Sequence, residues 1–91
     1  MILHHIDLTE TREIAPGIMA SRDSQGDMRL HTATRFLGYA HRWAETPDGR
    51  PRFHAHAWNA SGARKLNRYD YRTKAGAERA LIRLAPQLIK V

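Results

Sequence analysis

The clearest pattern of apolar and polar positions lies near the C-terminal end of the chain. Apolar residues recur there at the three- and four-residue spacing of one helix face: Ala77, Ala80, Leu81, Leu84 and Leu88. Thr73 is a residue type that caps helix N-termini, and Pro86 removes a backbone donor, so the pattern predicts a helix over residues 74–85. Lys74 and Glu78 lie four residues apart, and we expect them to pair along this helix.

Three segments in the middle of the chain have the composition of β-strands, namely residues 39–43, 52–58 and 64–71. Turn-forming residues separate them, with a Pro-Asp-Gly turn at residues 47–49 in the first gap and residues 59–62 in the second. This order predicts a three-stranded antiparallel meander over residues 39–71.

The middle strand of this meander divides its side chains between two faces, because side chains alternate along a strand. Phe53, Ala55 and Ala57 share the face that suits packing against the predicted helix and its alanines. The opposite face carries Arg52, His54, His56 and Trp58. With Trp43 paired near His54, the neighbouring strand adds Tyr39, His41 and Trp43 to this face. We expect this face to be exposed as a binding surface; the alternative is that the N-terminal hairpin covers it.

The N-terminal third of the chain has a weaker pattern. Apolar and polar residues alternate on both sides of the turn-forming residues 23–27, which predicts a hairpin near residues 18–36. Residues 30–44 also fit helical spacing, but the threonines and the glycine among them favour strand. The first ten residues are expected to be a loose segment. The predicted fold is therefore α+β, with an antiparallel sheet of four to five strands packed on one C-terminal helix, in a single domain over residues 1–91.

Composition limits the class of protein further. The chain has 91 residues and no cysteine, which fits one small domain and excludes disulfide bonds and thiolate zinc sites. No apolar run approaches the roughly 18 residues that span a membrane. We therefore expect a soluble, cytoplasmic protein with no membrane partner.

Charge is distributed unevenly along the chain. Fifteen Lys and Arg against nine Asp and Glu give a net charge of +6. Residues 35–91 hold twelve of these bases and four of the acids, so this part alone carries +8, whereas residues 1–34 carry −2. Between residues 50 and 74, seven bases face one acid, Asp70. Such a positive field attracts nucleic acid, anionic lipid or an acidic protein.

The predicted open face of the meander combines these bases with aromatic rings and histidines. Aromatic rings stack on bases and arginines contact phosphates, so the combination is typical of nucleic-acid binding. We predict a small, basic, non-catalytic binding module whose partner is nucleic acid or, alternatively, an acidic or RNA-containing host protein complex. We also expect affinity for an anion to rise as the histidines gain protons below pH about 6.5. The candidate contact residues are Tyr39, His41, Trp43, Arg50, Arg52, His54, His56, Trp58, Arg64, Lys65 and Arg68.

About half of the chain, residues 38–84, resembles the DNA-binding domains of plant ethylene-response factors and the arm-binding domains of tyrosine integrases. The resemblance is carried by residues 52–58, the turn at 59–62, and residues 69–81, where aromatic residues precede a threonine-capped, alanine-rich helix. It implies a three-stranded sheet that enters the DNA major groove with the helix packed behind it. It also implies that Arg52, His54 and His56 lie on the DNA side, together with the basic residues of the third strand, and it favours DNA over RNA.

Other chemistry has less support in the sequence. His41, His54 and His56 could hold zinc or copper, but no cysteine or suitably spaced carboxylate joins them, so we expect no metal ion or other cofactor. No nucleophile elbow, phosphate-binding glycine loop or pair of carboxylates is present. We therefore expect no enzyme, with a small ribonuclease that uses one of these histidines as base as the alternative. The small size also fits a phage or mobile-element inhibitor, of the anti-CRISPR or host-takeover kind, that binds a host complex.

Overall fold

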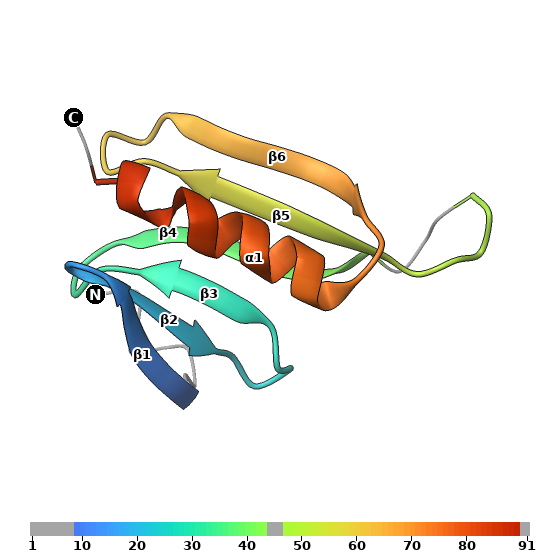
Figure 1. Ribbon diagram of the computed structural model, residues 1–91, viewed down its shortest axis with the longest axis horizontal. Coiled ribbons are helices and arrows are strands. Elements are labelled where there is room, and N and C mark those ends of the chain that lie inside the picture. The colour runs from blue at the N-terminus through green and yellow to red at the C-terminus, as the bar shows by residue number, and fades with distance from the viewer. Residues whose placement is uncertain (1–8, 44–46, 90–91) are drawn as a thin grey trace.

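The chain forms an antiparallel sheet with one helix packed on one of its faces (Figure 1). The computed structural model describes residues 9–43 and 47–89. Its strands are β1 (Thr9–Ala15), β2 (Ile18–Arg22), β3 (Met28–His31), β4 (Phe36–Trp43), β5 (Arg52–Trp58) and β6 (Arg64–Tyr71). The helix α1 (Lys74–Leu84) follows β6 and continues into a short 3-10 helix, η2 (Ala85–Gln87). Each strand pairs with the next along the chain, so the described sheet has six strands in the order β1 to β6.

The predicted α+β class is confirmed, but the predicted number of four to five strands is wrong because the sequence pattern does not reveal β1. Glu10 has a φ of 51°, and the pairing of β1 with β2 shifts register twice. These irregularities break the two-residue alternation that marks a strand. Of the predicted loose segment 1–10, residues 1–8 lie outside the described residues, while Thr9 and Glu10 belong to β1.

The remaining strand predictions can be compared directly with the sheet. Residues 39–71 form the meander β4–β5–β6, as predicted. Of the segment 30–44, which also fits helical spacing, the described residues 30–43 form no helix; they contain the end of β3, a turn and β4. Thr32 closes that turn, because its hydroxyl accepts hydrogen bonds from the backbone N–H groups of Thr34 at 3.3 Å and Arg35 at 3.0 Å. The predicted hairpin is β2–β3, which extends the sheet beside β4 rather than covering one of its faces.

The predicted helix over residues 74–85 is confirmed by α1 and its cap. The Thr73 side chain accepts a hydrogen bond from the Gly76 N–H at 3.0 Å, which satisfies one of the free donors of the first turn. The helix gives way to η2 at Ala85, and Pro86 lies in the first turn of η2. The expected ion pair between Lys74 and Glu78 is absent from the described hydrogen bonds and ion pairs. Instead, Lys74 donates to the Gly26 carbonyl at 2.8 Å.

Glu78 binds Arg22 of β2 and thereby joins the sheet to the helix. Two hydrogen bonds, of 2.7 and 2.9 Å, connect the Arg22 guanidinium to the two carboxylate oxygens of Glu78. Glu78 is only 9% exposed, so its carboxylate has lost most of its contact with water. The bidentate, charge-assisted hydrogen bonds to Arg22 compensate for this loss. Hydrogen bonding to Glu78 also raises the pKa of Arg22 above its ordinary value.

Small residues let α1 lie close to the centre of the sheet. The helix contacts mainly β4 and β5, where Ala55, Ala57 and Ala77 are fully buried together with larger apolar residues. Gly38 of β4 pairs with Ala57, and a Cβ at Gly38 would lie 2.5 Å from the backbone oxygen of His56. A side chain at this position would therefore force β4 and β5 apart.

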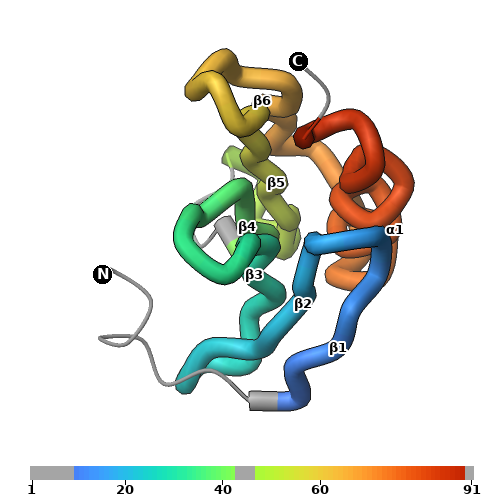
Figure 2. Tube along the Cα trace, turned by 90° about the vertical axis from the view of Figure 1, so that its left-hand side faces the viewer, coloured from blue at the N-terminus to red at the C-terminus, as the bar shows by residue number. Residues whose placement is uncertain are grey.

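Figure 2 shows that α1 lies on one side of the sheet, with β1 curving toward it. Contacts between β1 and η2 close this side of the molecule. Among the described residues, no helix covers the opposite side of the sheet. We call that opposite side the outer face.

Candidate functional site

The outer face carries a cluster of rings drawn from three neighbouring strands. Tyr39 of β4 pairs with His56 of β5, and His41 pairs with His54, so these side chains project from the same side of the sheet.

The predicted division of β5 into two faces is confirmed, because Ala55 and Ala57 lie in the core. The register differs by two residues from the assumed one, since Trp43 pairs with Arg52 rather than near His54. A two-residue shift preserves which face each side chain occupies. The ring cluster comprises Phe36, Tyr39, His41, His54, His56, Trp58 and Tyr69.

Four rings of this cluster form a compact block, two from β4 and two from β5. The centroids of Phe36 and Tyr39 are 5.9 Å apart with 25° between the ring planes. Tyr39 lies 5.3 Å from His56 at 29°, and His56 lies 5.5 Å from Trp58 at 8°. Trp58 is also 6.2 Å from Phe36 and 6.3 Å from Tyr39, so the four rings form a closed group, which we call the ring block.

Arginines from the two flanking strands lie against the ring block. The Arg29 guanidinium, from β3, is 5.6 Å from the centre of the Phe36 ring and 5.7 Å from that of Tyr39. The Arg64 guanidinium, from β6, is 5.5 Å from the centre of the Trp58 ring. These distances are those of cation–π contacts, which orient the guanidinium groups beside the rings.

The two histidines of β5 are buried in the middle of the cluster. His54 and His56 are each 6% exposed, and rings of β4 and β6 lie beside them. His54 Nδ1 shares a hydrogen bond of 2.8 Å with His41 Nε2. The other buried nitrogens, His54 Nε2 and His56 Nδ1, have no hydrogen-bond partner among the described residues.

Burial makes these imidazoles poor phosphate contacts. Burial, with added repulsion from the charges of His56, His41 and Arg64, lowers the pKa of His54 from 6.5 to about 4. Burial, followed by the charges of Arg64 and His41, also lowers the pKa of His56. His54 is therefore neutral at pH 7 and does not gain the positive charge near pH 6.5 that the sequence suggested.

The remaining candidate residues lie at the margins of the outer face or away from it. Arg50 and Arg52 lie at the end of the molecule where residues 47–51 extend beyond α1 (Figure 1), and Arg52 donates to Asp48 Oδ2 at 2.9 Å. Arg68 pairs with Asp70 and lies 4.6 Å from the ring of Tyr71, which packs against the core beneath α1. The side chain of Trp43 lies outside the described residues.

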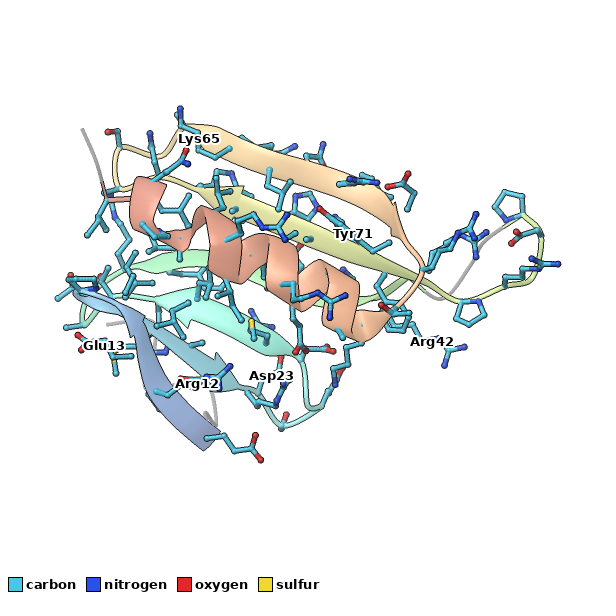
Figure 3. All side chains as sticks on the ribbon, in the orientation of Figure 1. Arg12, Glu13, Asp23, Arg42, Lys65 and Tyr71 are labelled. Atoms are coloured by element: carbon cyan, nitrogen blue, oxygen red, sulfur yellow. The ribbon has the colours of Figure 1, made fainter. Side chains whose placement is uncertain are left out.

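Lys65 is exposed at the start of β6, next to Arg64. Figure 3 shows it at the end of the sheet opposite to Arg42 and the 47–51 loop. The structure therefore brings Trp58 and Arg64 together, with Lys65 at the same end of the sheet, while Arg50 and Arg52 lie at the other end.

Several residues of this surface were missed by the sequence reasoning. Phe36 and Tyr69 complete the ring cluster, and Arg29 lies against it. The alternation of residues 28–36 placed Phe36 in the apolar set with Met28, but a register shift between Leu30 and His31 turns it to the outer face. No local signal in the sequence indicates this shift.

A serine beside a histidine is a second arrangement that the sequence did not indicate. Ser21 Oγ lies 2.7 Å from His31 Nε2 and 2.8 Å from Thr11 Oγ1, and His31 Nδ1 lies 3.2 Å from the Thr32 carbonyl oxygen. Ser21 is 1% exposed, so a substrate could not reach its hydroxyl. This chain of hydrogen bonds connects β1, β2 and β3.

Comparisons with known protein families, with curated proteins and with solved structures give no match to this chain. Within the described residues, no three His, Asp or Glu side chains are grouped so that they could hold a metal ion. None of the helices in this part of the chain is long and apolar enough to cross a membrane.

Proposed function

We propose that this protein binds nucleic acid through the outer face of its sheet. The observation that supports this most is the ring block of Phe36, Tyr39, His56 and Trp58, with Arg29 against its β4 rings and Arg64 against Trp58. Rings of this kind stack on nucleobases, and guanidinium groups contact phosphates. A sheet face that offers both is chemically complementary to a nucleic-acid strand.

The distribution of charge supports the same partner. Arg35 and Arg64 are exposed and lie near Trp58, and Lys65, which follows Arg64 in β6, is exposed as well. The net charge of +6 would also attract a polyanion from a distance and speed its association. Because His54 and His56 are buried, arginine, lysine and the outer rings make the contacts in this proposal, and the histidines support the rings from within.

The resemblance to sheet-type DNA-binding domains supports binding through a sheet face, but the sheet here differs from the sheet of those families. In those families a three-stranded sheet enters the major groove, whereas this meander belongs to a six-stranded sheet in the described chain. DNA remains the first ligand to test, and RNA is the comparison.

Fluorescence anisotropy tests the proposal directly. Labelled single-stranded DNA, duplex DNA and single-stranded RNA are titrated at about 50 mM and about 200 mM salt. We expect at least one ligand to bind at micromolar concentration or below, with affinity that falls steeply with salt because phosphate contacts release counterions.

A pair of matched double variants locates the contact. Arg64→Gln with Lys65→Gln removes the charge beside Trp58 and the exposed charge that follows it in β6, whereas Arg79→Gln with Arg83→Gln removes two exposed charges from α1, on the other side of the sheet. We expect the first pair to weaken binding about tenfold and to reduce the salt dependence, and the second to have much less effect. No binding of any nucleic acid at low salt would overturn the proposal, and the inhibitor of a host protein complex would become the alternative to test.

A further inference from the structure

A hollow of about 330 Å³ lies beside the Phe36 and Trp58 rings of the ring block. Its lining comes from the start of β4 and from the turn between β5 and β6: Arg35, Phe36, Trp58, Asn59 and Gly62. The rings of Phe36 and Trp58 have centroids 6.2 Å apart and planes tilted by 45°, so they spread apart rather than stack. A Cβ at Gly62 would meet no atom within 4 Å, which shows that this side of the hollow is open.

From this geometry we infer that the hollow binds one unpaired nucleobase and that the ligand is therefore a single-stranded nucleic acid. This inference rests on the proposed nucleic-acid binding and adds the strand state of the ligand. A base within a duplex is stacked on both faces and paired at its edge, so it has no free face to present to the rings of the hollow. An unpaired base has a free face for Phe36 or Trp58.

The position of the hollow beside the ring block is the first argument for a planar aromatic ligand. Tyr39 and His56 lie among other rings of the cluster and do not line the hollow. Phe36 and Trp58 are neighbouring rings of the block that both line the hollow, where a further flat ring can contact them. A flat base gains more from such a site than a flexible aliphatic group does.

The polar groups around the hollow give the second argument, because they fit a base attached to phosphates. The Asn59 side-chain oxygen accepts hydrogen bonds from the N–H groups of Ser61 at 3.0 Å and Ala63 at 2.9 Å. Its NH₂ group makes no hydrogen bond within the described residues and is a donor that suits the acceptors on a base edge. Arg35 lines the hollow, Arg64 lies against Trp58, and no acidic residue is part of the lining.

Tryptophan fluorescence can test this inference with the full chain. The sequence has two tryptophans, so the variant Trp43→Phe leaves Trp58 as the reporter. Unlabelled oligonucleotides of about 15 nucleotides, as single-stranded DNA, as single-stranded RNA and as duplex DNA, are added at low salt. We expect the single strands to quench Trp58 and to bind about tenfold or more tighter than the duplex, as stacking of a base predicts.

Substitutions separate the hollow from the rest of the outer face. Phe36→Leu removes one ring of the hollow, and Tyr69→Leu removes a ring of the same face that does not line it. We expect about a tenfold loss of single-strand affinity for the first and less than about a twofold loss for the second. Asn59→Asp keeps the oxygen that the turn requires, replaces the NH₂ group by a carboxylate oxygen, and should weaken binding without unfolding the protein.

The outcomes distinguish this inference from the proposed function. Equal or tighter binding of duplex DNA, or unchanged single-strand affinity in both Phe36→Leu and Asn59→Asp, would overturn the inference while salt-dependent binding still supported the proposed function. Absence of binding to all three nucleic acids would overturn both. Should Phe36→Leu fail to fold, as judged by circular dichroism, Asn59→Asp and Arg35→Gln decide the question.

Discussion

Acidification should destabilise this fold because it forces a proton onto a buried imidazole. His54 is 6% exposed, and burial, together with the charges of His56, His41 and Arg64, lowers its pKa from 6.5 to about 4. In the unfolded chain the pKa returns to about 6.5. Between these two values the unfolded state binds more protons than the folded state. The stability from neutral His54 is therefore complete above pH about 6.5 and is lost as the pH falls toward about 4.

The size of this effect follows from the difference between the two pKa values. A difference of about 2.5, at about 1.4 kcal/mol for each pH unit, amounts to about 3 kcal/mol when the pH is below both values. At about pH 5 the same relation gives a loss of about 2 kcal/mol relative to about pH 8. That loss is a large share of the roughly 5–15 kcal/mol by which small domains are stable. Burial lowers the pKa of His56 as well, so His56 acts in the same direction.

Urea unfolding followed by tryptophan fluorescence measures the effect. The free energy of unfolding is determined at about pH 8, 6.5 and 5 for the natural chain and for His54→Phe, which keeps a ring but cannot titrate. Carboxylates titrate in both proteins, so the difference between the proteins isolates His54. We expect the variant to lose about 2 kcal/mol less than the natural chain over this range. A natural chain whose stability is constant from about pH 8 to 5, or an equal loss in both proteins, would refute the reasoning.

Three substitutions test the contacts that hold the sheet to its helix and its strands to one another. Glu78→Gln removes the buried carboxylate that binds the Arg22 guanidinium, and because Arg22 is partly exposed and also pairs with Glu10 we expect a loss of about 2 kcal/mol in urea unfolding; an effect below about 0.5 kcal/mol would contradict this. Gly38→Ala places a methyl group against the His56 backbone oxygen and should lower stability by about 1–3 kcal/mol, so an unchanged melting temperature would show that β4 and β5 can separate freely. Thr73→Ala removes the helix cap and should cost about 1 kcal/mol, whereas Thr73→Ser should cost much less; equal losses would exclude the hydroxyl as the cause.

Much of the candidate surface follows from local spacing in the sequence. The two-residue repeat of β5 assigns Ala55 and Ala57 to the core and His54 and His56 to the outer face, and the structure agrees. The error of two residues in the assumed register did not change the predicted faces, because a shift by an even number of residues keeps every side chain on its face. The positive charge of residues 35–91 can likewise be counted from the sequence alone.

The burial of side chains within the outer face could not be predicted from local spacing. The sequence presents His54 and His56 as surface histidines, yet rings from β4 and β6 lie beside them and burial keeps them neutral at pH 7. Which side chains enclose a given residue depends on neighbours that are distant in the chain. The hollow lined by Phe36 and Trp58 could not be predicted from local spacing either. Its two rings are separated by 21 residues of sequence and come together only through strand pairing that includes a register shift.

The sequence by itself determined the elements that depend on local preferences: the Thr73-capped helix, the turns, the meander from β4 to β6 and the two faces of β5. These follow from the three- and four-residue repeat of a helix, the two-residue repeat of a strand and the backbone preferences of turn residues. Only the tertiary structure decided that β1 joins the sheet, that Glu78 binds Arg22 rather than Lys74, and that His54 and His56 are buried. These features arise from contacts between segments that are far apart along the chain. Such contacts stabilise the protein only once the strands have paired and the helix has packed on the sheet.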